Sequence, residues 1–182
     1  MKVLLEGRPG SGKTTVARRA GELLVARGFV TSELRDGGRR VGFAVEALDG
    51  ERAILAHVNL PGPPRVGKYG VDLQAFERVA LPALERVRDG DVVVVDELGK
   101  MELASDRFVA AFEGLLERRV SLVATVHVFR HPFTDRLKRV ADVEVIRVTS
   151  ANRDRLPEQL AARVASLRRP GRPARPGEPG HR

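Results

Sequence analysis

One stretch near the amino terminus combines glycines, a lysine and a threonine at a spacing that suits phosphate binding. It fits the pattern G-x-x-x-x-G-K-[ST], and its residues are Gly7, Arg8, Pro9, Gly10, Ser11, Gly12, Lys13 and Thr14. Glycines lack a Cβ, so the backbone can turn its N–H groups inward toward phosphate oxygens. Lys13 adds a charge for the β- and γ-phosphates, and the Thr14 hydroxyl is an oxygen ligand suited to Mg²⁺. The stretch predicts a nucleoside-triphosphate site that extends to Thr15, for which we expect a packing or capping role and no catalysis.

Two acidic residues follow a run of four valines, Val92 to Val95, which is typical of a buried parallel strand. Open α/β sheets bind ligands at the carboxyl ends of their strands, so Asp96 is placed to hold Mg²⁺. Side chains alternate along a strand, so we expect Glu97 to point to the other side. A carboxylate near Mg²⁺ and within reach of water can act as a general base, and we predict this role for Glu97.

Hydrophobic patterns indicate the elements that position these residues. A short apolar run, 3–5, precedes the phosphate loop, and a helical pattern over 14–25 follows it. Further helical patterns cover 73–87, 105–116 and 156–167, and buried strands are predicted over 92–95, 120–126 and 143–148. Strand-like runs over 29–31, 41–48 and 53–58 are separated by Asp-Gly turns, which favours antiparallel pairing. The predicted fold class is α/β: a mostly parallel sheet flanked by helices, with an antiparallel hairpin extension.

Other segments carry polar residues that can reach a bound nucleotide. Residues 59–70 contain three prolines and three glycines and are predicted to be a loop, either a phosphate lid or a plain surface loop. Two interpretations stay open for His127, which senses the γ-phosphate or is a hydrogen-bonded histidine at the edge of the core. One cation of the basic segment Arg130, Arg136, Lys138 and Arg139 can act as an arginine finger, and the sequence does not say which.

Composition separates the chain into two parts. Its 182 residues suit one domain, which we place at residues 1–167. Residues 168–182 hold five arginines, one glutamate and four prolines, so this tail carries about half of the net charge of +8. We expect the tail to be disordered and at most to touch nucleic-acid phosphates weakly. The chain has no cysteine, no apolar run long enough for a membrane span and no apparent signal peptide, so we expect a cytoplasmic protein.

Five segments, taken in chain order, resemble the THEP1 family of nucleoside triphosphatases. They are residues 7–15, 39–43, 65–72, 96–102 and 152–154, and the likeness spans 1–167. The resemblance implies a RecA-like phosphate-loop fold and slow, broad-specificity hydrolysis of ATP, GTP and other triphosphates with Mg²⁺. It also implies that Lys68 or a nearby arginine closes over the γ-phosphate. Asn152 and Arg153 lie where a base can stack, although Arg153 can equally pair with Asp154 or cap a helix.

The predicted function is therefore hydrolysis of nucleoside triphosphates, with two alternatives. A nucleoside or nucleotide kinase, which the family also resembles, uses the same parts and passes the phosphate to an acceptor hydroxyl. A nucleotide-switched nucleic-acid-binding module would use the basic tail, and its binding would be salt-dependent and lost when 168–182 are removed. The aromatic content of 4% leaves few stacking platforms, so nucleic acid is an unlikely partner. No motif specifies the preferred base or the oligomeric state.

Overall fold

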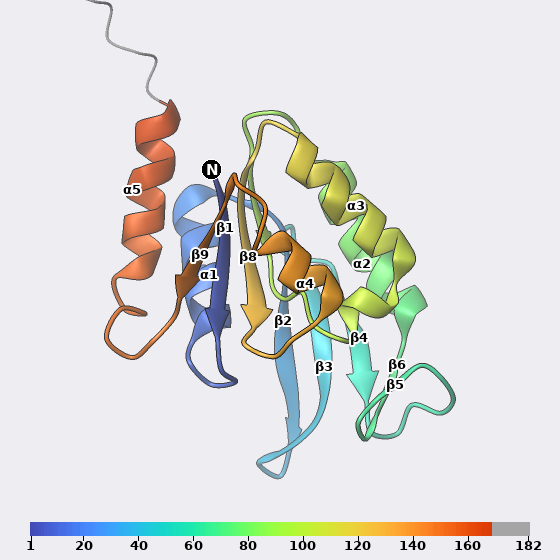
Figure 1. Ribbon diagram of the computed structural model, residues 1–182. Coiled ribbons are helices and arrows are strands. Elements are labelled where there is room, and N and C mark those ends of the chain that lie inside the picture. Colours follow the sequence, from blue (N-terminus) through green and yellow to red (C-terminus); the bar gives the residue numbers. More distant parts are fainter. Residues whose placement is uncertain (169–182) are drawn as a thin grey trace, which may run out of the picture.

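A nine-stranded mixed sheet forms the centre of the protein, in the order β5-β6-β4-β3-β2-β7-β8-β1-β9 (Figure 1). The computed structural model describes residues 1–168. The tail predicted for residues 168–182 therefore lies, except for Arg168, outside the described part of the chain. The strands are β1 (Lys2–Gly7), β2 (Arg27–Asp36), β3 (Arg39–Ala47), β4 (Arg52–His57), β5 (Arg65–Val66), β6 (Tyr69–Val71), β7 (Val92–Val95), β8 (Ser121–His127) and β9 (Val143–Arg147).

Five of these strands, β2, β7, β8, β1 and β9, run parallel, as the valine-rich runs predict. β8 lies between β1 and β7, and its Ala124 is in register with Leu4 on one side and Val95 on the other. The same register pairs Gly7 with His127. The phosphate loop, the acids after β7 and the end of β8 therefore meet at one edge of the sheet, the lower edge in Figure 1.

The remaining strands form the antiparallel extension that the sequence predicts, with β3 beside β2 and β4 beside β3. The prediction that 59–70 is entirely a loop was wrong, because β5 and the start of β6 lie within it. Proline and glycine disfavour strands locally, but pairing of Ala56 with Val71 and of His57 with Gly70 supplies partners from β4. A Cβ on Gly70 would lie 2.2 Å from the Leu60 carbonyl oxygen, so this close approach requires glycine.

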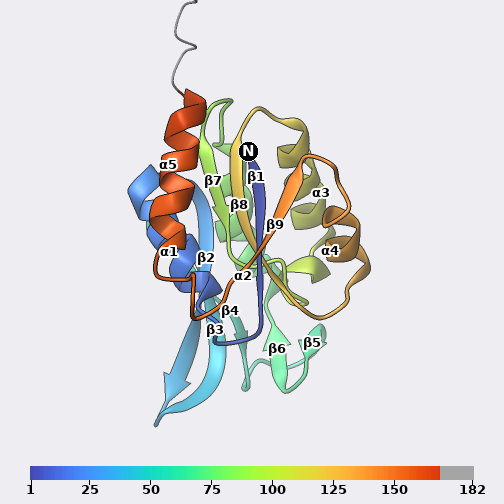
Figure 2. The same cartoon turned by 60° about the vertical axis from the view of Figure 1, so that its left-hand side comes forward.

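Helices cover both faces of the sheet, as Figures 1 and 2 show. On one face α1 and α5 pack side by side, and on the other α2 and α3 pack together with the shorter α4 beyond them. Each face has its own apolar core. Within the larger one, the rings of Phe29, Phe76 and Phe108 meet edge to face at 5.2–5.6 Å. The helices are α1 (Lys13–Leu24), α2 (Leu73–Glu85), α3 (Asp106–Glu117), α4 (Pro132–Leu137) and α5 (Leu156–Arg168), and a 3-10 turn, η1, covers Glu102–Ala104.

Local capping signals fix where the two central helices begin. The Asp72 carboxylate accepts a hydrogen bond of 2.8 Å from the Ala75 amide at the start of α2. The Ser105 hydroxyl accepts one of 3.1 Å from the Phe108 amide and donates another of 2.7 Å to Glu77 of α2. The cap of α3 is thereby tied to α2, which fixes the segment between β7 and α3. Among residues 1–168, no helix has the length and apolar character needed to cross a bilayer.

Candidate active site

The phosphate loop joins β1 to α1 and curls over the first turn of that helix. Gly10 and Gly12 have φ angles of +78° and +99°, which side chains rarely tolerate. The Ser11 amide donates a hydrogen bond of 3.1 Å to the Arg8 carbonyl, which closes the turn. A Cβ on Gly7 would lie 2.3 Å from the Ser11 hydroxyl oxygen. The glycines thus allow the curled backbone that the sequence pattern predicts.

Two side chains of the loop are suited to a phosphate group. The Ser11 hydroxyl is buried and has no hydrogen-bond partner within the described residues. The Lys13 side chain is only 6% exposed, and its Nζ lies 3.4 Å from the Arg8 carbonyl oxygen. A buried ammonium whose hydrogen bonds are incompletely used favours an incoming anion, because its hydration has already been lost. The loop is therefore prepared to bind phosphate oxygens.

Asp96 is completely buried at the end of β7 and is surrounded by threonine hydroxyls. One carboxylate oxygen accepts hydrogen bonds from Thr14 (3.1 Å) and Thr125 (2.5 Å), and the other from Thr31 (3.3 Å). Burial raises the pKa of Asp96, an effect that the hydrogen bond from Thr125 opposes. A cation beside Asp96 and Thr14 would favour the charged carboxylate. Both donors are oxygens, which suits a hard divalent cation that keeps phosphate and water as its other ligands.

Glu97 lies beside Lys13, with its Oε2 3.9 Å from the Lys13 Nζ. Its other oxygen, Oε1, is 2.5 Å from Nε2 of His127, at the end of β8. Asp96 is bonded to threonines, whereas Glu97 faces Lys13 and His127, so the two neighbouring carboxylates have different partners. That they point to opposite sides, as alternation along a strand predicts, stays a prediction.

The side chains of Lys13, Thr14 and Glu97 border a chamber of about 730 Å³. Its walls come from the phosphate loop and α1, from β2 and β3, from residues 97–103 and from residues 127–134. Pro9, Gly10, Gly12, Lys13, Thr14 and Thr15 of the predicted loop line it. Glu97, Lys13 and Thr14 thus line one cavity, and the buried Asp96 is joined to it through its hydrogen bond with Thr14. The cavity can bind a polyphosphate and place a carboxylate beside its end.

Comparison with known proteins shows the family of the chain. Residues 2–161 match a protein-family model described as NTPase. The chain belongs to the THEP1 nucleoside-triphosphatase family. The nucleoside-triphosphatase THEP1 of Thermotoga maritima is 41% identical over 162 residues, covering 88% of this chain and 93% of the relative. That of Thermofilum pendens is 45% identical over 174 residues, covering 90% and 95% of the two chains.

Two solved structures share the fold over nearly their whole length. The crystal structure of THEP1 from Aquifex aeolicus superposes with a TM-score of 0.83 at 33% identity, covering 90% of this chain and 99% of that one. The solution structure of a human cancer-related nucleoside triphosphatase gives 0.79 at 38% identity, covering 92% and 99%. The fold and the family membership that the sequence motifs indicate are thereby confirmed.

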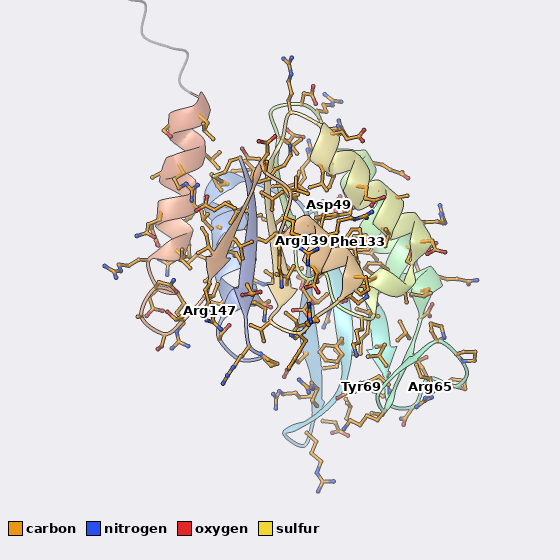
Figure 3. The ribbon with its side chains drawn as sticks, in the orientation of Figure 1. Asp49, Arg65, Tyr69, Phe133, Arg139 and Arg147 are labelled. Atoms are coloured by element: carbon orange, nitrogen blue, oxygen red, sulfur yellow. The ribbon has the colours of Figure 1, made fainter. Side chains whose placement is uncertain are left out.

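Three residues that the THEP1 resemblance implicates lie outside the chamber lining. Lys68 belongs to the turn between β5 and β6, whose position is marked by Arg65 and Tyr69 in Figure 3, and its Nζ lies 5.4 Å from the Tyr69 ring centre. The Asn152 side chain bonds the Thr149 amide and the Arg147 carbonyl, both at 2.8 Å, and so shapes the turn after β9. Arg153 approaches the phosphate loop, because its Cδ would contact a Cβ on Gly12 at 3.2 Å. Nucleotide contacts by these residues stay predictions.

Of the four basic residues after β8, Arg130 lines the chamber, and its side chain is 91% exposed. Arg136 pairs with Glu113, and Lys138 pairs with Glu6 at 2.7 Å. Arg139 is exposed and lies outside the lining (Figure 3). Arg130 is therefore the member of the segment that is best placed to reach a bound phosphate, but no strong contact holds it there.

Sequence reasoning missed several residues around the site. Thr31 approaches Asp96 only because β2 lies beside β7, and Phe43 reaches the chamber only because β3 folds back along β2. No sequence motif marks either residue. Glu102 does belong to a motif of the family, but the motif does not show that the side chain is buried. In the structure Glu102 is 5% exposed and lies beside Glu97.

Glu102 should make the stability of the free protein fall as the pH rises. Burial, and next the charge of Glu97, raise the pKa of Glu102 from 4.5 to about 8. Between these values the folded state holds a proton that the unfolded state has released, so the unfolding free energy decreases by up to about 1.4 kcal/mol per pH unit. The Glu102→Gln protein lacks this dependence and should gain stability relative to wild type as the pH increases.

Urea denaturation at several pH values between about 5 and 8 measures this difference. Glu117→Gln, at an exposed position of α3, is the matched control and should follow wild type at every pH. Parallel stability curves for wild type and Glu102→Gln would show that Glu102 is not held protonated in the folded state.

Proposed function

We propose that the protein hydrolyses nucleoside 5′-triphosphates to the diphosphate and phosphate, with Mg²⁺ as cofactor. The observation that carries the proposal is the placement of Glu97, with one carboxylate oxygen 3.9 Å from the phosphate-binding Lys13 and the cavity in front of it. Family membership supports the same activity, because the relatives are named nucleoside-triphosphatases. The backbone of the loop, Ser11 and Lys13 would bind the phosphates, and Thr14 and Asp96 would hold the metal.

Glu97 would act on the attacking water. A water oxygen attacks the γ-phosphorus, the bond to the β–γ bridging oxygen breaks, and the proton of the water passes to the Glu97 carboxylate. Mg²⁺ supplies neutralisation of the charge that develops on the phosphate oxygens. His127, which also lines the cavity, lies 2.5 Å from the other carboxylate oxygen and would help to orient it. The diphosphate and phosphate then leave, and Glu97 releases its proton to solvent.

We further propose that turnover is slow and that base specificity is broad. The loop, Lys13, Thr14 and Asp96 would contact the phosphates and the metal, and phosphates are common to all nucleoside triphosphates. An arginine finger contributes about 10³–10⁵ in rate when it is fixed on the transition state. Arg130, the candidate that lines the cavity, is 91% exposed and lies 3.8 Å from Asp135, so that contribution is weakly organised.

Phosphate release from ATP, GTP, CTP and UTP tests the proposal. We expect all four to be hydrolysed with Mg²⁺, at rates that agree within about tenfold, which corresponds to about 1.4 kcal/mol of discrimination between bases. Removing the metal with a chelator should abolish release, and adding Mg²⁺ back should restore it. Undiminished hydrolysis in the chelator would contradict the metal role, and hydrolysis of a single triphosphate would contradict broad specificity.

A further inference from the structure

The chamber has room for more than the terminal phosphates and one attacking water molecule. Its volume of about 730 Å³ lies in the range of sites for whole organic ligands, whereas a water molecule occupies about 30 Å³. Part of the space belongs to the terminal phosphates and their cation. The rest extends from Glu97 to the antiparallel extension, where Phe43 and Val66 form the wall. The strands that carry the phosphate loop and the acids do not supply this wall, which comes from β3 and β5.

This outer part of the chamber lies on the side from which the γ-phosphate is attacked. An attacking oxygen approaches the γ-phosphorus in line with the bond to the leaving oxygen, and therefore opposite the rest of the triphosphate. If Glu97 activates the nucleophile, the wall that Glu97 and His127 form marks this attack side. The nucleoside of the bound triphosphate then lies on the side of the γ-phosphate that faces away from this wall. Whatever fills the outer chamber is accordingly a second molecule.

The apolar part of the outer chamber suits a flat ligand such as a nucleoside base. The Phe43 ring is held edge-on by Tyr69, at 5.3 Å between centroids, and apolar side chains of Val66, Met101 and Leu103 lie around the same space. The guanidinium of Arg40 lies 5.3 Å from the Phe43 ring centre, but its charge is paired with Glu33 at 2.7 Å.

A second arginine of the lining, Arg18, is paired in the same way with Glu46 at 3.2 Å. Because these two cations already have carboxylate partners, a further phosphate group would gain little from them. Thr31 and Ser32 add hydroxyl groups to the lining that can hydrogen-bond a sugar. Lys100 and Arg130 also line the chamber. The aromatic platform, the apolar contacts and the hydroxyl groups beside the two paired arginines provide contacts for the base and the sugar of a nucleoside.

We propose that the outer chamber, defined by Phe43, Val66, Met101 and Leu103, binds a neutral nucleoside whose hydroxyl takes the place of water beside Glu97. This proposal rests on the proposed function, since it uses the same bound triphosphate and the same base. The nucleoside oxygen forms a bond to the γ-phosphorus while the bond to the β–γ bridging oxygen breaks. The hydroxyl proton passes to Glu97 and then to solvent, and the products are a nucleoside monophosphate and a nucleoside diphosphate.

Nucleoside binding and transfer are measured on the same protein. Adenosine, guanosine, cytidine, uridine and thymidine are titrated by calorimetry into the protein saturated with Mg²⁺ and adenosine 5′-(β,γ-imido)triphosphate. Each is then incubated with γ-labelled ATP, and labelled phosphate and labelled nucleoside monophosphate are separated. We expect at least one nucleoside to bind beside the analogue and to divert label from phosphate to the monophosphate.

Two variants locate the binding site. Phe43→Ala should weaken the binding of that nucleoside by about tenfold or more, the loss typical of one stacking contact. Ile54→Ala removes a half-exposed apolar side chain from β4, outside the chamber, and should leave the affinity unchanged.

The proposal would be overturned if none of the nucleosides bound at millimolar concentration, if the nucleoside displaced the triphosphate analogue, or if binding diverted no label. A Phe43→Ala protein that loses affinity for the triphosphate analogue as strongly as for the nucleoside would also overturn it, since the chamber would then hold the base of the triphosphate. Phosphate release without nucleoside is recorded in parallel, so failure of the hydrolase proposal is seen separately.

Discussion

Replacing Lys13 with alanine should weaken nucleoside-triphosphate binding by at least about 100-fold. A hydrogen bond to a charged group contributes about 1.5–3 kcal/mol, and the buried Lys13 ammonium can bond to two phosphates. Its removal also leaves the Glu97 carboxylate, 3.9 Å away, without its cation, so the phosphates would meet an uncompensated negative charge. Both effects act in the same direction, which is why this substitution should have the largest effect on affinity.

Titration of each triphosphate with Mg²⁺ into wild type and Lys13→Ala measures the loss. Lys2→Ala, at the opposite end of β1, is the matched control and should bind like wild type. Because the Lys13 side chain is only 6% exposed, Lys13→Met, which keeps an aliphatic chain in that space, separates lost charge from lost packing. If Lys13→Met binds like wild type, the ammonium is not the phosphate-binding group.

Replacing Glu97 with glutamine should lower the turnover number by about 10²–10⁴-fold while triphosphate binding is kept. This range is the usual contribution of a general base. Glutamine has the same shape and keeps an oxygen that can accept from His127, but its amide cannot take the proton of the attacking water. Removing a negative charge next to the γ-phosphate should, if anything, tighten binding of the triphosphate.

Single-turnover phosphate release and direct titration separate the two effects in Glu97→Gln. Glu22→Gln, at an exposed position of α1, is the control and should retain wild-type turnover and affinity. Turnover that matches wild type in Glu97→Gln would assign the base to another group in the chamber. A joint loss of binding and turnover would instead give Glu97 a role in holding the substrate.

Several features of the site could be read from the sequence because they are encoded locally. The phosphate loop depends on glycines at fixed positions between a strand and a helix, and the φ angles of Gly10 and Gly12 agree with that requirement. The capping roles of Asp72 and Ser105 likewise follow from one side chain and an amide three residues later. The valine run before Asp96 marks a buried parallel strand by composition alone.

One prediction failed where the outcome depended on contacts distant in the sequence. Residues 59–70 are rich in strand-breaking residues, yet pairing with β4 makes two short strands there. Alternation along β7 likewise does not name the partners of the two acids, which are threonines for Asp96 and Lys13 and His127 for Glu97. Local sequence patterns cannot give either result, because each depends on packing against segments distant in the sequence.

Residues that are neighbours in the sequence specify the phosphate loop, the helix after it and the acidic pair after a buried strand. The surroundings of these groups depend on how distant segments pack. The register of β1, β8 and β7 places His127 beside Glu97, and the position of β2 brings Thr31 to Asp96. The fold of β3 along β2 adds Phe43 to the chamber wall. The physical reason is that strand order and register are set by burial and by hydrogen bonds between distant segments, whereas loops and caps are set by a few neighbouring residues.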